Sequence, residues 1–131
     1  MTAPLILIAD DDPLIQAIVD LKLRAAGYRT AMESDGAAVL AEARMLRPDL
    51  IVLDALMPGT DGFEVLRRLR QDPSLAAVKV VMLTALRRDE DQAEARRLGA
   101  AAYFVKPFDP DQLIECVVRL APPPSARRAS C

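Results

Sequence analysis

The chain has 131 residues, with 17 basic and 19 acidic side chains and no histidine. This length predicts one domain, and a hydrophobic content of 52% is enough to build a buried core. The absence of histidine excludes Ser-His-Asp and Cys-His catalytic relays and imidazole-bound zinc or haem. Two cysteines are too few for a disulfide framework, and no apolar run reaches the ~18 residues of a membrane span, so we expect a cytoplasmic protein.

Short apolar runs alternate along the chain with segments of helical period. The first run, residues 5–9, is continuously apolar, which is typical of a strand buried on both faces of a parallel sheet. The other predicted strands are residues 28–32, 50–53, 78–83 and 103–105. The second is more polar than the rest, so we expect it at an edge of the sheet.

Capping residues mark the starts of the predicted helices. Asp12-Pro13 and Asp109-Pro110 each combine an N-cap with a proline in the first turn. Ser34 is the expected cap of the second helix, and Asp61 begins the third. In the first helix we expect one apolar face, formed by Leu14, Ile15, Ile18, Leu21 and Ala25. Residues 87–97 are highly charged, and their expected anchors are Leu86, Ala93, Ala95 and Leu98.

Five strand-helix units in strict alternation predict an α/β fold, a doubly wound five-stranded parallel sheet with helices on both faces. Ligands of such sheets bind at the carboxyl ends of the strands. The polar residues expected there are Asp10, Asp11, Asp12, Asp54, Thr84 and Lys106.

These positions suit phosphoryl transfer. The carboxylates of Asp10, Asp11 and Asp54 can converge on a hard cation, and ligands that are all oxygen favour Mg²⁺ or Mn²⁺ over zinc. Lys106 adds a compact positive charge and Thr84 a hydroxyl donor. A carboxylate nucleophile with these partners can become an acyl phosphate.

Four segments together resemble the receiver domain of two-component response regulators, of the chemotaxis type with a flavodoxin-like fold. They are Ile8-Ala9-Asp10-Asp11-Asp12-Pro13, Asp54-Ala55-Leu56-Met57-Pro58-Gly59-Thr60-Asp61-Gly62, Met82-Leu83-Thr84-Ala85 and Lys106-Pro107-Phe108. The resemblance extends over residues 4–121. It implies the strand order 2-1-3-4-5, with five helices in a three-layer α/β/α sandwich.

The resemblance also implies a role for each site residue. Asp54 would take a phosphoryl group from a phosphohistidine of a sensor kinase or phosphotransfer protein. Asp10, Asp11, Asp54 and the backbone carbonyl of Leu56 would hold the magnesium ion. The implied phosphoryl-binding and switch residues are Thr84, Ala85, Lys106 and Tyr103. Tyr103 would turn inward when Thr84 moves toward the phosphoryl group.

The expected output is a change of the surface formed by the fourth helix, the fifth strand and the last helix. That surface would control a downstream protein, a missing effector domain or a second copy of the chain. The enzymatic role would be limited to its own phosphorylation and dephosphorylation. The net charge of −2, and a last helix without the Glu-Leu and trailing arginine pattern of many DNA-binding regulators, favour no direct contact with nucleic acid. No membrane contact is expected.

Residues 1–121 are the expected receiver domain, and residues 122–131 a proline-rich flexible tail or the start of a linker. Two other functions stay open from the residues alone: a flavodoxin-like electron carrier, and a pseudo-receiver used only for docking. The triple aspartate can also be a solvated capping loop, residues 87–97 a solvated helix, and Tyr103 an ordinary core aromatic.

Two apolar positions depart from the common receiver pattern. Leu56 lies two residues after Asp54, and Leu86 two residues after Thr84, where family members often carry polar side chains. Both flank the path that water would take to a phosphoryl group. Our hypothesis is that apolar cover slows hydrolysis and lengthens the life of the phosphorylated state.

Overall fold

The protein is described by a computed structural model that covers residues 2–124. The main sheet contains five strands, β1 (Leu5–Ala9), β2 (Arg29–Glu33), β3 (Leu50–Leu53), β6 (Lys79–Thr84) and β7 (Ala102–Val105). The α-helices are α1 (Pro13–Ala25), α2 (Val39–Leu46), α3 (Gly62–Gln71), α4 (Asp89–Arg97) and α5 (Pro110–Leu120).

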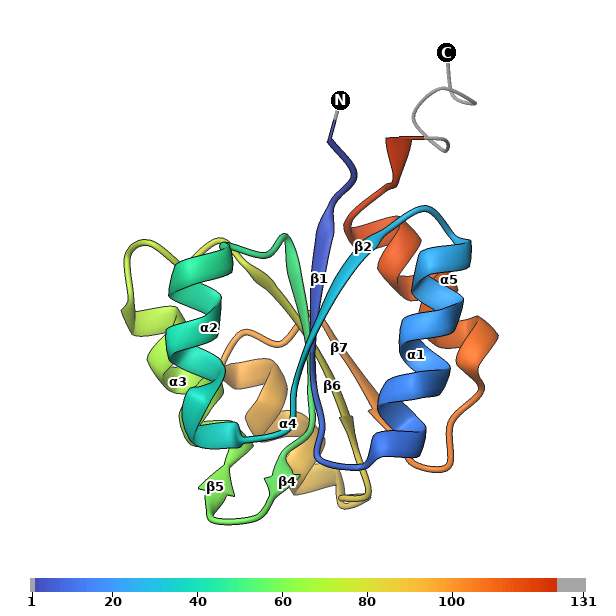
Figure 1. Cartoon of the computed structure of the whole chain (residues 1–131). Coiled ribbons are helices and arrows are strands. Elements are labelled where there is room, and N and C mark those ends of the chain that lie inside the picture. Colours follow the sequence, from blue (N-terminus) through green and yellow to red (C-terminus); the bar gives the residue numbers. More distant parts are fainter. Residues whose placement is uncertain (1, 125–131) are drawn as a thin grey trace.

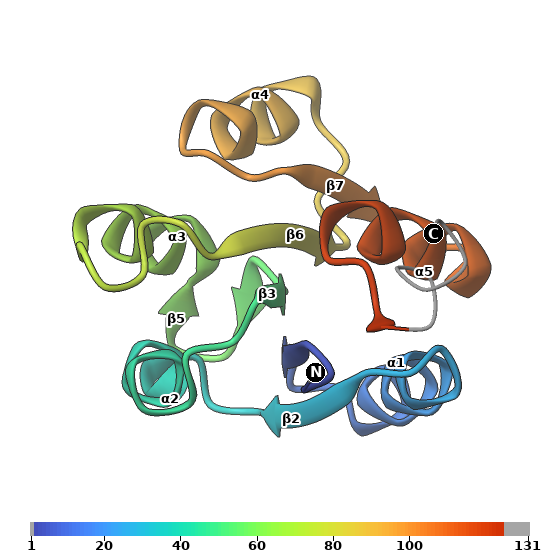
Figure 2. The same ribbon diagram turned by 90° about the horizontal axis from the view of Figure 1, so that it is seen from above.

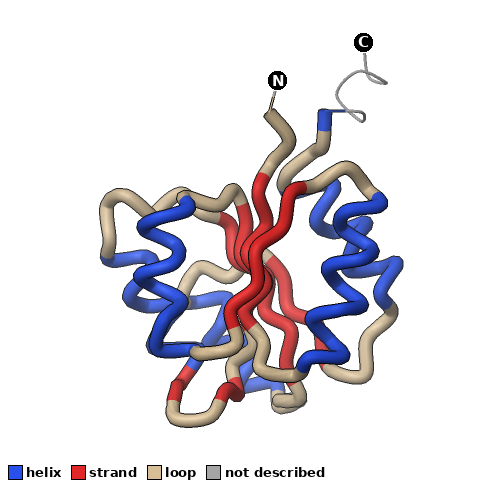
Figure 3. The backbone as a smooth tube through the Cα atoms, in the orientation of Figure 1, coloured by secondary structure: helices blue, strands red, loops and turns tan. Residues whose placement is uncertain are grey.

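All strands of the main sheet run parallel, in the order β2-β1-β3-β6-β7. Counted along the main sheet alone this is 2-1-3-4-5, so the predicted doubly wound topology is confirmed, with β2 at an edge. The sheet stands between two helical layers, with α1 and α5 on one face and α2, α3 and α4 on the other (Figures 1 and 2). Strands are enclosed by helices on both sides (Figure 3).

The continuously apolar strands are buried because both faces of the sheet are covered. Every residue of β3 is buried, and alternate side chains enter different cores. Ile51 and Leu53 face the α2, α3 and α4 side, whereas Leu50 and Val52 face α1 and α5. Cys116 lies in the second core as a small buried side chain.

The predicted apolar face of α1 is only partly right, since Ile15 packs against the core but Leu14, Leu21 and Ala25 are exposed. Val19 and Leu23 are the buried residues of this helix, while Leu14 and Leu21 are 65% and 70% exposed. Leu14 and Leu21 lie seven residues apart and so share one side of the helix, which points away from the sheet. Apolar residues occur around most of this helix, so periodicity alone did not identify the side that packs.

The start of the second helix also differs from the prediction. Asp35, not Ser34, is the cap: its carboxylate accepts a hydrogen bond from Ala37 N at 3.0 Å. It caps a short 3-10 turn, η1 (Gly36–Ala38), and α2 then begins without a side-chain cap.

Three of the four expected anchors of the α4 segment pack against the core, namely Leu86, Ala95 and Leu98. Ala95 is buried as predicted, but Ala93 is exposed and Asp91 is buried. The carboxylate of Asp91 is paired with Arg88, at 3.1 and 3.2 Å. A polar anchor of this kind is not visible in a hydrophobic pattern.

A small antiparallel hairpin follows β3 and was not predicted. It pairs β4 (Leu56–Met57) with β5 (Thr60–Asp61), and Gly59 occupies its turn with φ +70°. The two strands are too short for a period-two pattern to reveal them. Within residues 2–124, no helix has the length and apolar character needed to cross a membrane.

Candidate functional site

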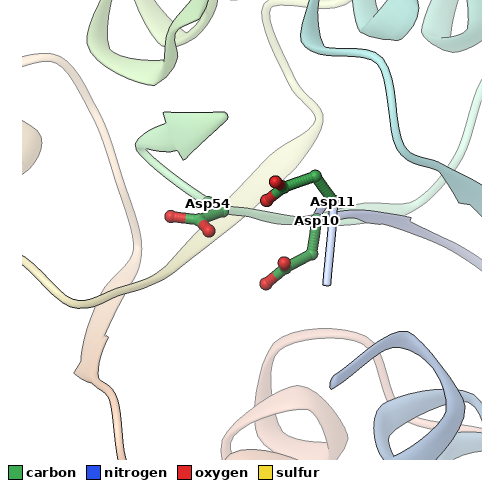
Figure 4. Close-up of side chains that lie close together, drawn as sticks. All are labelled: Asp10, Asp11 and Asp54. Atoms are coloured by element: carbon green, nitrogen blue, oxygen red, sulfur yellow. The ribbon is translucent and has the colours of Figure 1, made fainter. Parts of the chain in front are cut away.

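The acidic residues predicted to converge lie at the carboxyl ends of β1 and β3. These strands are neighbours in register, with Ala9 opposite Leu53, so Asp10 and Asp54 emerge side by side. Both are almost completely buried, at 1% and 4% exposure, whereas Asp11 is exposed. One carboxylate oxygen from each of the three lies within 4.8 Å of the others (Figure 4).

The two buried carboxylates are held in the same way. One oxygen of Asp10 accepts from the backbone N–H of Asp12, and one oxygen of Asp54 from that of Leu56, both at 2.9 Å. The second oxygen of each accepts from Lys106 Nζ, at 2.7 Å for Asp10 and 2.9 Å for Asp54. A single ammonium therefore bridges both acids, and the backbone bonds fix where their free lone pairs point.

Lys106 reaches the acids from the end of β7. Its backbone N–H donates to the Thr84 carbonyl at 2.8 Å, which extends the β6–β7 ladder by one bond. The Lys106–Pro107 peptide is cis. Burial lowers the pKa of the ammonium, but the hydrogen bonds to Asp10 and Asp54 outweigh that effect and leave the pKa above its usual value.

Asp10 is the acid of the cluster whose ionised form is disfavoured by burial. Burial raises the pKa of its carboxyl, and the hydrogen bonds from Lys106 and Asp12 offset this only in part. A raised pKa in the folded state means that ionised Asp10 weakens the fold as pH rises through that pKa. A bound cation would relieve this cost.

The predicted switch residues lie on or directly after β6, the neighbour of β3, and β7, the edge strand beyond it. Thr84 ends β6 and is fully buried, and its hydroxyl accepts from Leu86 N at 3.4 Å; Ala85 beside it is exposed. Tyr103 on β7 is partly buried and donates its hydroxyl to the Leu86 carbonyl at 2.9 Å. Burial, with the nearby carboxylates, raises the pKa of this tyrosine.

A close backbone contact supports the loop that carries Asp54. Helix α3 begins at Gly62, capped by Asp61, and a Cβ at Gly62 would lie 2.4 Å from Ala55 Cα and 2.7 Å from the Asp54 carbonyl oxygen. Only glycine permits this approach. Leu56, the next residue of the loop with a predicted role, has its side chain half exposed.

Two contacts to site residues were not predicted. Gln16 of α1 donates its side-chain amide to the Asp10 carbonyl at 2.5 Å, and Arg87 donates to the Lys106 carbonyl at 3.1 Å. Both bonds end on backbone atoms of site residues. No sequence signal identifies such partners, and Arg87 lies in the charged segment 87–97, for which a solvated helix and an output surface both stay open.

The donor set fits a hard divalent cation. The cluster consists of Asp10, Asp11 and Asp54, so all the side-chain ligands that it offers are carboxylate oxygens. Ligands of this type select magnesium or manganese.

Comparison with known proteins agrees with this arrangement. The profile of the response regulator receiver domain matches residues 6–118. The chain belongs to this family. It is 44% identical over 111 residues to the DNA-binding dual master transcriptional regulator RpaA of Synechocystis, and the match covers 85% of this chain and 46% of RpaA. The receiver therefore spans about half the length of that curated relative.

Solved receiver structures have the same fold. The chemotaxis response regulator CheY4 of Vibrio cholerae superposes with a TM-score of 0.84 at 33% identity, over 91% of this chain and 99% of CheY4. The receiver domain of sensor histidine kinase PA1611 from Pseudomonas aeruginosa PAO1 gives 0.81 at 28% identity, over 92% and 98% of the two chains. The latter is described with a magnesium ion coordinated in its active site cleft.

Proposed function

We infer from membership of the receiver family that this chain takes part in phosphorylation-dependent signalling. We propose that Asp54 is its phosphoacceptor and that the phosphoryl group comes from the phosphohistidine of a sensor kinase or phosphotransfer protein. One observation carries the proposal: Asp54 is a buried carboxylate within 4.8 Å of two further acids and 2.9 Å from an ammonium. Burying an ionised carboxylate at the end of an apolar strand is costly without such partners.

The transfer is an in-line displacement. An Asp54 carboxylate oxygen attacks phosphorus, the phosphorus–nitrogen bond of the donor breaks, and the leaving imidazole carries its electron pair and takes a proton. Lys106, now bound to the attacking carboxylate, is placed to pass to the phosphoryl oxygens as negative charge moves there. None of these 131 residues is a histidine, so the phosphohistidine donor would lie outside them.

Asp10, Asp11 and Asp54, with the backbone carbonyl of Leu56, would hold a magnesium ion. When bound, the ion neutralises charge on the acids and on the transferred group. The supporting observation is the all-oxygen cluster, in which Asp10 bears a raised pKa because it is buried.

The output follows from Thr84 and Tyr103. We propose that the Thr84 hydroxyl leaves Leu86 N to bind the phosphoryl group together with Ala85 N–H, and that Tyr103 follows the moving loop. The signal then reaches the surface of α4, β7 and α5. Helix α4 suits this change because its inward contacts are few, with only Asp91 and Ala95 buried.

The partner of that surface is proposed from the relatives. RpaA is described as a DNA-binding transcriptional regulator, and this chain spans less than half of it. The partner could be a downstream protein, an attached effector domain or a second phosphorylated copy. The expectation of no contact with nucleic acid is not supported by these DNA-binding relatives. We take residues 1–121 as the receiver; most of the proposed tail at 122–131 lies outside the described residues, although Pro123 is buried.

The proposal is tested by incubating the protein with Mg²⁺ and acetyl phosphate and measuring intact mass. The wild type should gain one phosphoryl group and Asp54→Ala none. Asp12→Asn is the matched control, because Asp12 caps α1 through Leu14 N and asparagine also caps helices well. Phosphate on Asp54→Ala would refute the assignment, and size-exclusion chromatography of the same samples reports dimerisation.

A further inference from the structure

Two side-chain hydrogen bonds tie the loop between β6 and α4, residues 85–88, to β7 and to the residue that follows it. The bond from Leu86 N to Thr84 Oγ1 is long, at 3.4 Å, and α4 begins without a side-chain cap. The first tie to β7 is the hydroxyl of Tyr103 on the Leu86 carbonyl. The Leu86 side chain packs partly against the core, and the hydrogen bonds to neighbouring elements add to the stability of the loop backbone.

The second tie comes from Arg87. Its Nη2 donates to the Lys106 carbonyl oxygen at 3.1 Å. On the other side of the same residue, the Lys106 N–H donates to the Thr84 carbonyl at 2.8 Å. The backbone of Lys106 is thus bonded at both its N–H and its carbonyl to the segment that begins with Thr84.

We propose that Arg87 is a positioning residue for phosphoryl transfer: its guanidinium holds the Lys106 backbone against the loop that follows Thr84. The proposal rests on the proposed role of Lys106 at Asp54. Lys106 has four rotatable side-chain bonds, so its Nζ stays on both acids only while its backbone is held. By joining Lys106 to the loop, Arg87 also makes the two phosphoryl-binding groups move together.

A positioning role predicts a specific kinetic signature. A hydrogen bond to an uncharged carbonyl contributes little net free energy. Its loss should therefore lower the maximal rate of phosphorylation about 2- to 10-fold. The half-saturating donor concentration should stay unchanged, because Arg87 acts through the Lys106 backbone and not on the donor. A direct contact with the donor anion would give the reverse pattern.

The test compares Arg87→Ala and Arg87→Lys with the wild type over a series of acetyl phosphate concentrations at saturating Mg²⁺. Arg87→Ala should show the lower maximal rate, and Arg87→Lys should recover much of it, since an ammonium can also donate to a carbonyl. Arg96→Ala is the charge-matched control, because Arg96 is exposed on α4 and away from the loop.

Hydrogen exchange of the Lys106 backbone amide supplies a readout that needs neither metal nor donor. Exchange should be faster in Arg87→Ala, restored in Arg87→Lys and unchanged in Arg96→Ala. Unchanged exchange in Arg87→Ala would overturn the proposal, as would a raised half-saturating concentration at an unchanged maximal rate, or an equal loss in Arg96→Ala. Failure of the wild type to accept phosphate would instead refute the proposed function and leave the exchange test intact.

Discussion

The contact between Gly62 and the Asp54 loop leads to a quantitative prediction for Gly62→Ala. The added Cβ would lie 2.4 Å from Ala55 Cα, whereas carbon atoms pack at about 3.5–4.0 Å. The backbone at Asp54 and Ala55 must therefore move by at least about 1 Å, the smallest difference between these distances. The backbone carbonyl of Asp54, 2.7 Å from the same Cβ, blocks a smaller adjustment.

Two effects of different size should follow. Overpacking of this kind costs about 1–3 kcal/mol of unfolding free energy. A shift of about 1 Å in the reacting carboxylate can cost up to about 100-fold in rate. The rate should fall because moving Asp54 disturbs its 2.9 Å hydrogen bonds from Lys106 and from the Leu56 N–H.

Gly59→Ala, in the turn of the hairpin that precedes Gly62, is the matched control. Gly59 has φ +70°, so alanine there is strained by about 1–2 kcal/mol, but nothing lies within 4 Å of the added Cβ. Urea denaturation should show comparable destabilisation of both variants, while phosphorylation by acetyl phosphate should fall only in Gly62→Ala. Wild-type phosphorylation of Gly62→Ala, or an equal loss in Gly59→Ala, would refute the reasoning.

Three further predictions concern the charge of Asp10 and Asp72 and the access of water to a phosphorylated Asp54. Asp10→Asn should raise the melting temperature in metal-free buffer at neutral pH, because the raised pKa of Asp10 means that its ionised form destabilises the fold. This gain in melting temperature should vanish below about pH 4, where Asp10 is protonated in both the folded and the unfolded state. Phosphate on the wild type should persist beyond seconds, and Leu56→Asn with Leu86→Glu should shorten its lifetime, as measured by intact mass over time. The pair with Arg44 lowers the pKa of Asp72 to about 2, so its contribution to stability is present above about pH 4 and lost as pH falls toward 2. Asp72→Asn should remove that part of the acid-unfolding curve followed by circular dichroism.

The sheet and the acid cluster could be predicted from the sequence for the same physical reason. A continuous apolar run such as residues 50–53 has few structures open to it besides a buried parallel strand, and a carboxylate at its end needs a partner. Parallel strands bring these ends to one edge, so Asp10 and Asp54 had to lie close together.

Loop contacts and helix rotations could not be predicted in this way. Leu14 and Leu21 are apolar yet exposed, because α1 carries apolar residues on more sides than the sheet can cover. The bond from Arg87 to the Lys106 carbonyl joins residues 19 positions apart and ends on a backbone atom, which every residue type possesses. The amino-acid sequence therefore does not indicate which residue accepts such a hydrogen bond.

The charges at the site indicate how phosphorylation of Asp54 would act on the loop at residues 85–88. One ammonium serves two buried carboxylates, so neither acid is neutralised by a partner of its own. A phosphoryl group on Asp54 would draw Lys106 from this shared position, because the new negative charge lies beyond the carboxylate. Asp10 would then keep its bond from Asp12 N–H and need a cation more strongly. Since the Lys106 backbone is tied to the loop after Thr84, a shift of the lysine would be passed to α4 by the same bonds that hold it in place.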